Sequence, residues 1–169
     1  MAIILISGFS NWGKTTIIKD IFARSYFKWG RVYPIPNVNN AVFTVETRSN
    51  DDYSKDTYIS EWKERIKFAP HQPYHLFGAF CPSRERKNNS YDILTNHPFD
   101  QHGDIHLLHL VRKWDHHAEL RMTEIRNYFS RIRHLHHHLI DADFNVQGDP
   151  ARQVSRAQQA ITILQSIFP

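Results

Sequence analysis

The chain has 169 residues, of which 41% are hydrophobic and 13% aromatic, so it can form one sizeable core and does not read as a disordered chain. Its formal net charge of +4 suits an anionic ligand, although charge alone does not indicate nucleic acid as a partner. Cys81 is the only cysteine, which rules out an internal disulfide. The first apolar run is shorter than a signal-peptide core or a membrane span, so we expect a cytoplasmic protein without a membrane partner.

Strands and helices are expected to alternate along the chain. Apolar, β-branched runs predict strands at residues 2–6, 41–45, 74–81, 105–111 and 134–141. Apolar residues at helical spacing predict helices at residues 14–25, 58–68, 116–132 and 150–168. Residues 26–40 are expected to be irregular, and residues 83–103 form a long polar stretch for which no element is predicted. This order predicts an α/β fold with a three-layer, mostly parallel sheet in one domain of residues 1–169, and a ligand at the carboxyl ends of the strands.

Residues 8–16 carry a specific motif between the first strand and the first helix. They read Gly-Phe-Ser-Asn-Trp-Gly-Lys-Thr-Thr, a complete G-x-x-x-x-G-K-[ST] pattern in strand–loop–helix context. Glycines let the backbone wrap a polyphosphate, which main-chain N–H groups and the helix N-terminus then bind. Lys14 brings a catalytic cation to the β and γ phosphates, and Thr15 offers a hydroxyl to Mg²⁺. The predicted nucleotide-binding residues are Gly8, Ser10, Asn11, Trp12, Gly13, Lys14, Thr15 and Thr16.

Charged side chains stand where later strands are expected to end. The second strand ends at Glu46, where a carboxylate can hold Mg²⁺ through water or act as a base, so Glu46 is a predicted catalytic and metal-binding residue. The fourth strand runs into Arg112-Lys113-Trp114-Asp115, and the fifth ends in Asp141-Ala142-Asp143. Trp12 either packs against Trp114 or a neighbouring segment, or stacks on a base, and the sequence leaves these alternatives open.

Together with residues 8–16, these strand ends resemble the P-loop NTPases and, among them, the small Ras-like GTPases. In that family a Lys-x-Asp motif and a later Ser-Ala-x loop bind guanine, and Lys113, Asp115 and Ala142 fall at those places. The resemblance implies that Asp115 accepts hydrogen bonds from guanine, that the Lys113 stem packs on the base and that Ala142 supplies a backbone N–H. It implies a Mg²⁺-dependent switch that binds GTP, with ATP as the alternative, and hydrolyses it slowly.

The chain also departs from that family. Arg112 stands where Asn or Thr is usual, and Glu46-Thr47-Arg48-Ser49 replaces the D-x-x-G segment. The family's water-orienting glutamine would fall near Asn50, which is a poor substitute and predicts weak intrinsic hydrolysis. The family's antiparallel hairpin strand is either absent or disguised within residues 26–40.

Two other functional classes remain open. A small P-loop kinase would use Glu46 as a base and an arginine-bearing lid, and residues 81–87 faintly resemble the S-P-x-R-x-x-R stretch of adenylylsulfate kinases. A nucleotide-gated binding module would hold its ligand without turnover and recruit a protein partner or a second copy of the chain. The acceptor, the partner and the oligomeric state stay open.

The chain contains twelve histidines, several of them in one expected strand. His134, His136 and His138 would share one face of that strand, and three imidazoles can bind Zn²⁺ or Ni²⁺. Side chains on one face of a strand are about 7 Å apart, so three consecutive ligands for one ion would require a bent strand. A metal site and a half-exposed, pH-sensitive edge strand both remain open.

Overall fold

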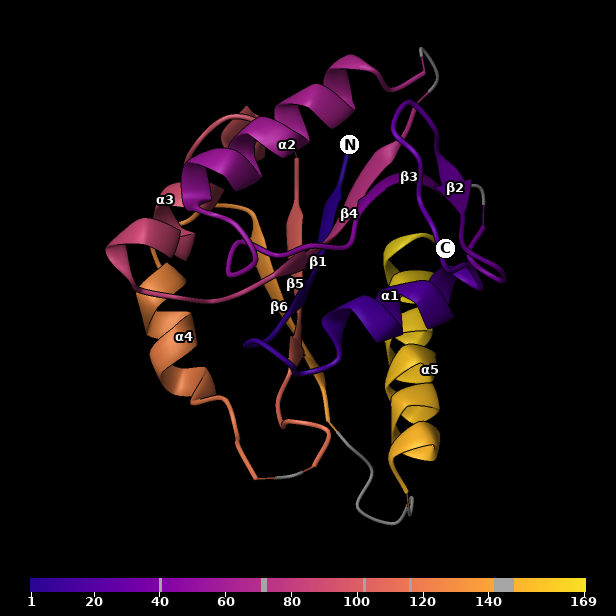
Figure 1. The fold of residues 1–169 in the computed structure, drawn as a ribbon, viewed down its shortest axis with the longest axis vertical. Coiled ribbons are helices and arrows are strands. Elements are labelled where there is room, and N and C mark those ends of the chain that lie inside the picture. Colours follow the sequence, from indigo (N-terminus) through magenta and orange to yellow (C-terminus); the bar gives the residue numbers. More distant parts are fainter. Residues whose placement is uncertain (40, 71–72, 102, 116, 142–147) are drawn as a thin grey trace.

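The computed structural model describes residues 1–39, 41–70, 73–101, 103–115, 117–141 and 148–169, and Figure 1 shows their arrangement. Within these residues a single six-stranded sheet has the order β2-β3-β4-β1-β5-β6, and β2 is antiparallel to β3 while the other pairs are parallel. The strands are β1 Ile3–Ser7, β2 Tyr33–Pro34, β3 Val42–Glu46, β4 His75–Phe80, β5 Ile105–Leu110 and β6 Leu135–Ile140. The central strand β1 is fully buried, as its unbroken apolar run requires.

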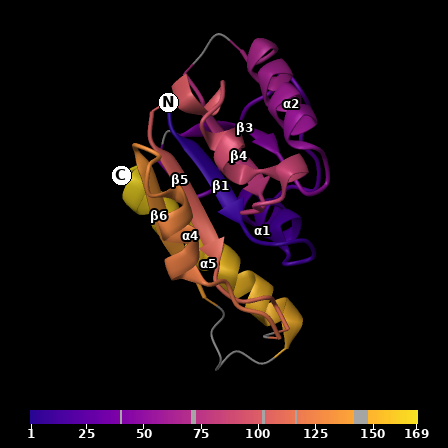
Figure 2. The same ribbon diagram turned by 90° about the vertical axis from the view of Figure 1, so that its left-hand side faces the viewer.

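Helices cover both faces of the sheet (Figure 2). They are α1 Lys14–Phe22, α2 Lys55–Lys67, α3 Ser90–Leu94, α4 Met122–Phe129 and α5 Asp149–Ile167, with 3₁₀ turns η1 Arg86–Asn88 and η2 Phe99–Gln101. Ser54 caps α2 by accepting a hydrogen bond from the Thr57 N–H, and Pro150 follows the first residue of α5, where a missing N–H costs nothing. The described helices include none that is long and apolar enough to cross a membrane.

Successive residues of β4 face opposite sides of the sheet and contact different helices. Phe77 packs edge-on against Phe22 of α1, at 5.0 Å between ring centroids. The next residue, Gly78, points the other way and lies against Trp62 of α2, whose indole occupies the space that a side chain would need. Phe80 lies on that second face and contacts Phe129 of α4. Helices α1 and α5 therefore cover one face and α2 and α4 the other, which is compatible with a three-layer α/β arrangement.

The expected α/β class with a mostly parallel sheet is confirmed, and two local expectations are wrong. Residues 26–40 are not wholly irregular, because Tyr33 pairs with Phe43 and forms the antiparallel strand β2. The polar stretch after β4, for which no element was predicted, contains α3 and two 3₁₀ turns, held by buried Ile93, Leu94 and Phe99. Of the helix expected from residue 116, which itself lies outside the described residues, residues 117–121 are not helical, and α4 begins at Met122 because the chain before it folds back.

Candidate functional site

The loop of residues 8–16 (hereafter the 8–16 loop) joins β1 to α1 at the carboxyl end of the sheet. Two residues with positive φ turn the chain, Asn11 at 60° and Gly13 at 87°. The N–H of Gly8 donates to the Phe80 carbonyl at 3.0 Å, which ties the start of the loop to β4. Among the residues that the structure describes, no side chain caps α1, so its amino end can meet an anion.

Lys14 places its ammonium inside this loop. The side chain is 7% exposed, and Nζ donates to the carbonyls of Gly8 at 2.9 Å and Phe9 at 2.8 Å. A carboxylate oxygen of Asp51 lies 3.6 Å from the same Nζ. The loop therefore holds one mostly buried positive charge, with one carboxylate beside it.

A cavity of about 410 Å³ opens over the loop. It is lined by Ser10, Asn11, Trp12, Gly13, Lys14, Thr15, Thr16, Ser49, Asp51, Asp52, Trp114 and Gln153. The structure thus gathers all the predicted loop residues from Ser10 to Thr16 around one cavity. Gly8 does not line this cavity, but its carbonyl accepts a hydrogen bond from the Lys14 ammonium. Thr15 directs its hydroxyl to the Thr47 carbonyl at 2.9 Å.

The segment after β3 forms the far wall, and it contributes a carboxylate that sequence reasoning missed. Ser49 donates its N–H to the Asp52 carboxylate at 2.9 Å and its hydroxyl to Asp51, which hold the turn. Asn50 is fully buried, donates its amide to the Cys81 carbonyl at 3.0 Å and accepts the Cys81 N–H at 2.7 Å. Asn50 therefore anchors this turn to the end of β4, and the anchor sets Asp51 facing Lys14.

Burial and the nearby Asp51 carboxylate raise the pKa of the Cys81 thiol to about 12. The thiol is accordingly neutral at physiological pH, which excludes it as a nucleophile of this site.

Glu46 forms a buried ion pair. Its Oε2 accepts from Nε and from Nη2 of Arg65, both at 2.8 Å, and its Oε1 accepts the Arg48 N–H at 2.9 Å. The side chains of Glu46 and Arg65 are 3% and 8% exposed. With both carboxylate oxygens engaged, Glu46 fixes α2 to the end of β3, and its assignment as base or metal ligand stays a prediction.

The segment after β5 folds back as a short antiparallel turn beside the loop. Lys113 and Asp115 pair with each other, with Nζ 2.7 Å from Oδ2, and Asp115 Oδ1 accepts the His117 N–H at 3.1 Å. These contacts, Lys113 foremost, lower the pKa of Asp115. Between them, Trp114 donates its indole N–H to the Asn11 carbonyl at 3.0 Å and so reaches the rim of the cavity.

Helix α5 contacts both the 8–16 loop and the segment after β5. Arg156 is fully buried and donates to the Arg112 carbonyl at 2.7 Å and the Trp12 carbonyl at 3.5 Å, and burial lowers its pKa. Gln153 lies so close to Gly13 that an added Cβ there would stand 2.8 Å from its amide nitrogen. Trp12 is 4% exposed and meets Phe9 edge-on, so its indole is packed in the protein.

Other predicted residues lie elsewhere. Arg112 pairs with Asp141 at 2.6 Å, which joins the ends of β5 and β6. Arg84 donates to the Glu124 carbonyl and lies over the Tyr128 ring of α4. It is not among the described residues that line the cavity. Ala142 falls outside the described residues.

Comparison with protein-family models, curated proteins and solved structures found no match to this chain.

Proposed function

We propose that this protein is a P-loop NTPase of the Ras-like kind, which binds a nucleoside triphosphate with Mg²⁺ in the cavity over the 8–16 loop and hydrolyses it slowly. The observation that carries the proposal is the Lys14 ammonium, held by two loop carbonyls at 2.8 and 2.9 Å in a cavity that Ser10 to Thr16 of the loop line. An anion entering the cavity meets this charge and the open end of α1 together. A polyphosphate is the ligand whose repeated negative charge suits both.

In this proposal Thr15 and Asp51 would hold Mg²⁺. The Thr15 hydroxyl, which donates to the Thr47 carbonyl in this structure, and the Asp51 carboxylate would supply its oxygen ligands, and the ion would offset the charge of the phosphates. Asp51 takes this place because it lines the cavity, whereas the Glu46 carboxylate is occupied by Arg65. Hydrolysis is slow because the Asn50 amide, at the family's water-orienting position, is used in holding the chain to Cys81.

The base is recognised by the segment after β5. Asp115 retains lone pairs beyond its bonds to Lys113 and His117, and a carboxylate there can accept from guanine N1–H and N2–H₂. The Trp114 indole at the rim offers a flat apolar surface to the ring. GTP is therefore the favoured ligand and ATP the alternative.

Titration calorimetry on two variants tests this assignment. Asp115→Ala is expected to weaken GTP about tenfold or more while leaving inorganic triphosphate unchanged, since a hydrogen bond to a charged group contributes about 1.5–3 kcal/mol. Asp51→Asn is expected to remove the Mg²⁺ dependence of nucleotide binding. The matched control is Asp20→Asn, which removes an exposed carboxylate of α1. Equal affinity of the wild type for GTP and ATP would contradict the base assignment.

A groove beside the cavity favours a kinase as the second candidate function. It measures about 500 Å³, and both spaces are lined by Thr15. Arg48, Tyr53 and Trp29 line the groove and could hold a small anionic or aromatic acceptor next to the γ-phosphate. Phosphate transfer from GTP or ATP to an added acceptor, weakened by Arg48→Ala, would support this candidate. Tight nucleotide binding with neither transfer nor hydrolysis would instead favour a non-hydrolysing module that recruits a partner.

A further inference from the structure

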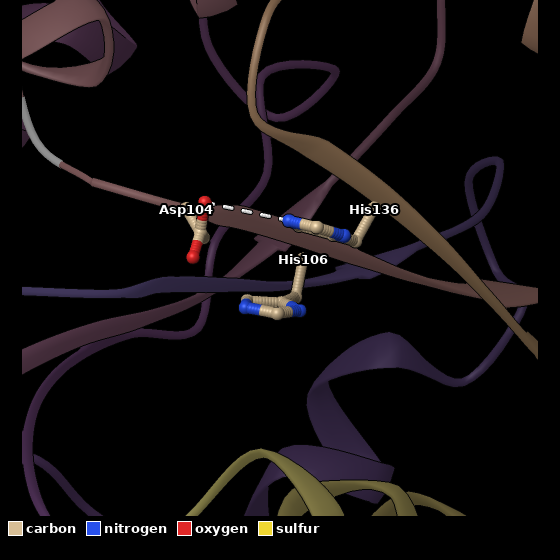
Figure 3. A group of neighbouring side chains, drawn as sticks. All are labelled: Asp104, His106 and His136. Carbon is tan, nitrogen blue, oxygen red and sulfur yellow. Dashed lines mark ion pairs between the residues drawn. The ribbon is translucent and has the colours of Figure 1, made fainter.

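The pairing of β5 with β6 gathers histidines from two strands at the amino-terminal end of the sheet. His106 pairs in register with His136, and the alternation of the strand places His138 on the same face. Asp104 immediately precedes β5. Three possible ligand atoms, one each from Asp104, His106 and His136, lie within 4.8 Å of one another (Figure 3).

The contacts among these side chains point their polar atoms at a common space. Nε2 of His136 lies 3.4 Å from Oδ1 of Asp104, and Figure 3 shows the His136 ring directed at that carboxylate with the His106 ring stacked beside it. The two imidazole centroids are 4.8 Å apart. His138 Nε2 lies 3.1 Å from His106 Nδ1, so His138 positions the His106 ring and leaves its other nitrogen for a ligand.

We propose that Asp104, His106 and His136 bind a divalent transition metal ion of the zinc type. Two imidazoles and one carboxylate form a donor set that suits Zn²⁺ and leaves one tetrahedral position for water. The ligands come from neighbouring strands, so the wide spacing of histidines along a single strand is no obstacle.

Burial supports this division of roles. His106 is 8% exposed and fixed in place, whereas the side chains of Asp104 and His136 are 53% and 49% exposed and free to turn inward by the small amount that bonds of about 2.1 Å require. His134 also approaches Asp104, at 3.6 Å, but it precedes the strand and is 74% exposed. The ion would tie the edge strand β6 to β5.

This site is separate from the proposed nucleotide cavity. His106 pairs with Ile4 of β1, four residues before Gly8, so the two sites are about 13 Å apart along the strands. Zinc binding and nucleotide binding can therefore be tested independently, and failure of one leaves the other standing.

The test is a titration of the chelator-stripped full chain with Zn²⁺ in the absence of nucleotide, followed by calorimetry and by the visible absorption of Co²⁺ as a substitute ion. We expect one ion per chain and a rise in Tm with zinc. The double variant Asp104→Asn/His136→Gln is expected to lose the Co²⁺ spectrum and the zinc-dependent rise in Tm while keeping wild-type nucleotide affinity. Both side chains are half exposed, so the fold is expected to survive.

Further variants separate the ligands from other histidines. His138→Ala is expected to weaken zinc about tenfold, as the loss of a partner that orients a ligand does. His134→Ala and the exposed His117→Gln are expected to leave the affinity unchanged. Absence of stoichiometric binding, or zinc affinity in the double variant within threefold of wild type, would overturn the proposal.

Discussion

The substitution Glu46→Gln separates a structural role of this carboxylate from a catalytic one. Glutamine keeps an oxygen for the Arg48 N–H but removes the negative charge, and so leaves the Arg65 guanidinium buried without its counter-charge. Breaking a buried ion pair by removing one partner costs about 3–5 kcal/mol. Because both residues also line the groove, where water can reach them, the low end applies.

We therefore expect the free energy of unfolding to fall by about 3 kcal/mol, which for a chain of this size lowers Tm by about 6–12 °C. Urea unfolding followed by fluorescence measures this directly. The double variant Glu46→Gln/Arg65→Met is expected to restore most of the lost stability, because Gln keeps an acceptor for the Arg48 N–H and no buried charge is left unpaired. In folded Glu46→Gln protein, nucleotide turnover is expected to stay within a few fold of wild type.

The opposite pattern would refute this reasoning. If Glu46→Gln unfolds within about 0.5 kcal/mol of the wild type but loses Mg²⁺-dependent turnover, the carboxylate serves the reaction and Asp51 does not take its place.

Three further predictions concern His109 and two glycines. Burial, with His137 and Arg126 nearby, lowers the pKa of His109 to about 3. Below pH 6.5 the unfolded chain therefore binds a proton at this imidazole that the native state does not, and the free energy of unfolding falls by about 1.4 kcal/mol per pH unit. Between pH 6 and 4.5, His109→Gln is expected to reduce this slope, measured by urea unfolding, by that amount. Gly78→Ala would place a Cβ 2.5 Å from the Trp62 ring and is expected to cost about 1–3 kcal/mol, whereas an unchanged Tm would show that the indole can move. Gly13→Ala combines a φ of 87° with a contact of 2.8 Å to Gln153, so we expect about 1–2 kcal/mol of strain and weaker nucleotide binding, and wild-type affinity would contradict a role for the loop shape.

Much of the fold could be predicted from local patterns, because strands and helices follow the period of apolar residues. The buried run of β1 and the strand ends near Glu46 and Asp141 came directly from that signal. The short strand β2 could not, since Tyr33 and Pro34 form a strand only through pairing with β3. Residues 117–121 were expected to be helical, but the antiparallel bridge between Arg112 and Glu119 holds the chain just before α4 outside a helix.

The candidate site shows the same limit. The sequence pattern of residues 8–16 was enough to predict which residues form this loop, because a loop between adjacent elements is a local feature. Asp51 and Gln153 were missed, since they reach the cavity only through the Asn50 anchor and the packing of α5. His106 was missed as a partner of His136 for the same reason, because strand pairing and not sequence spacing brings them together.

The central claim is that the 8–16 loop binds the phosphates of a nucleotide through Lys14. Calorimetric titration with GTP, ATP and their diphosphates, with and without Mg²⁺, tests it most directly, using Lys14→Ala beside the wild type and Lys19→Ala on the same helix as control. We predict one nucleotide per wild-type chain, tighter with Mg²⁺ and with three phosphates than with two, and binding lost in Lys14→Ala but kept in Lys19→Ala. Failure of the wild type to bind any of these nucleotides, or equal binding by Lys14→Ala, would contradict the account.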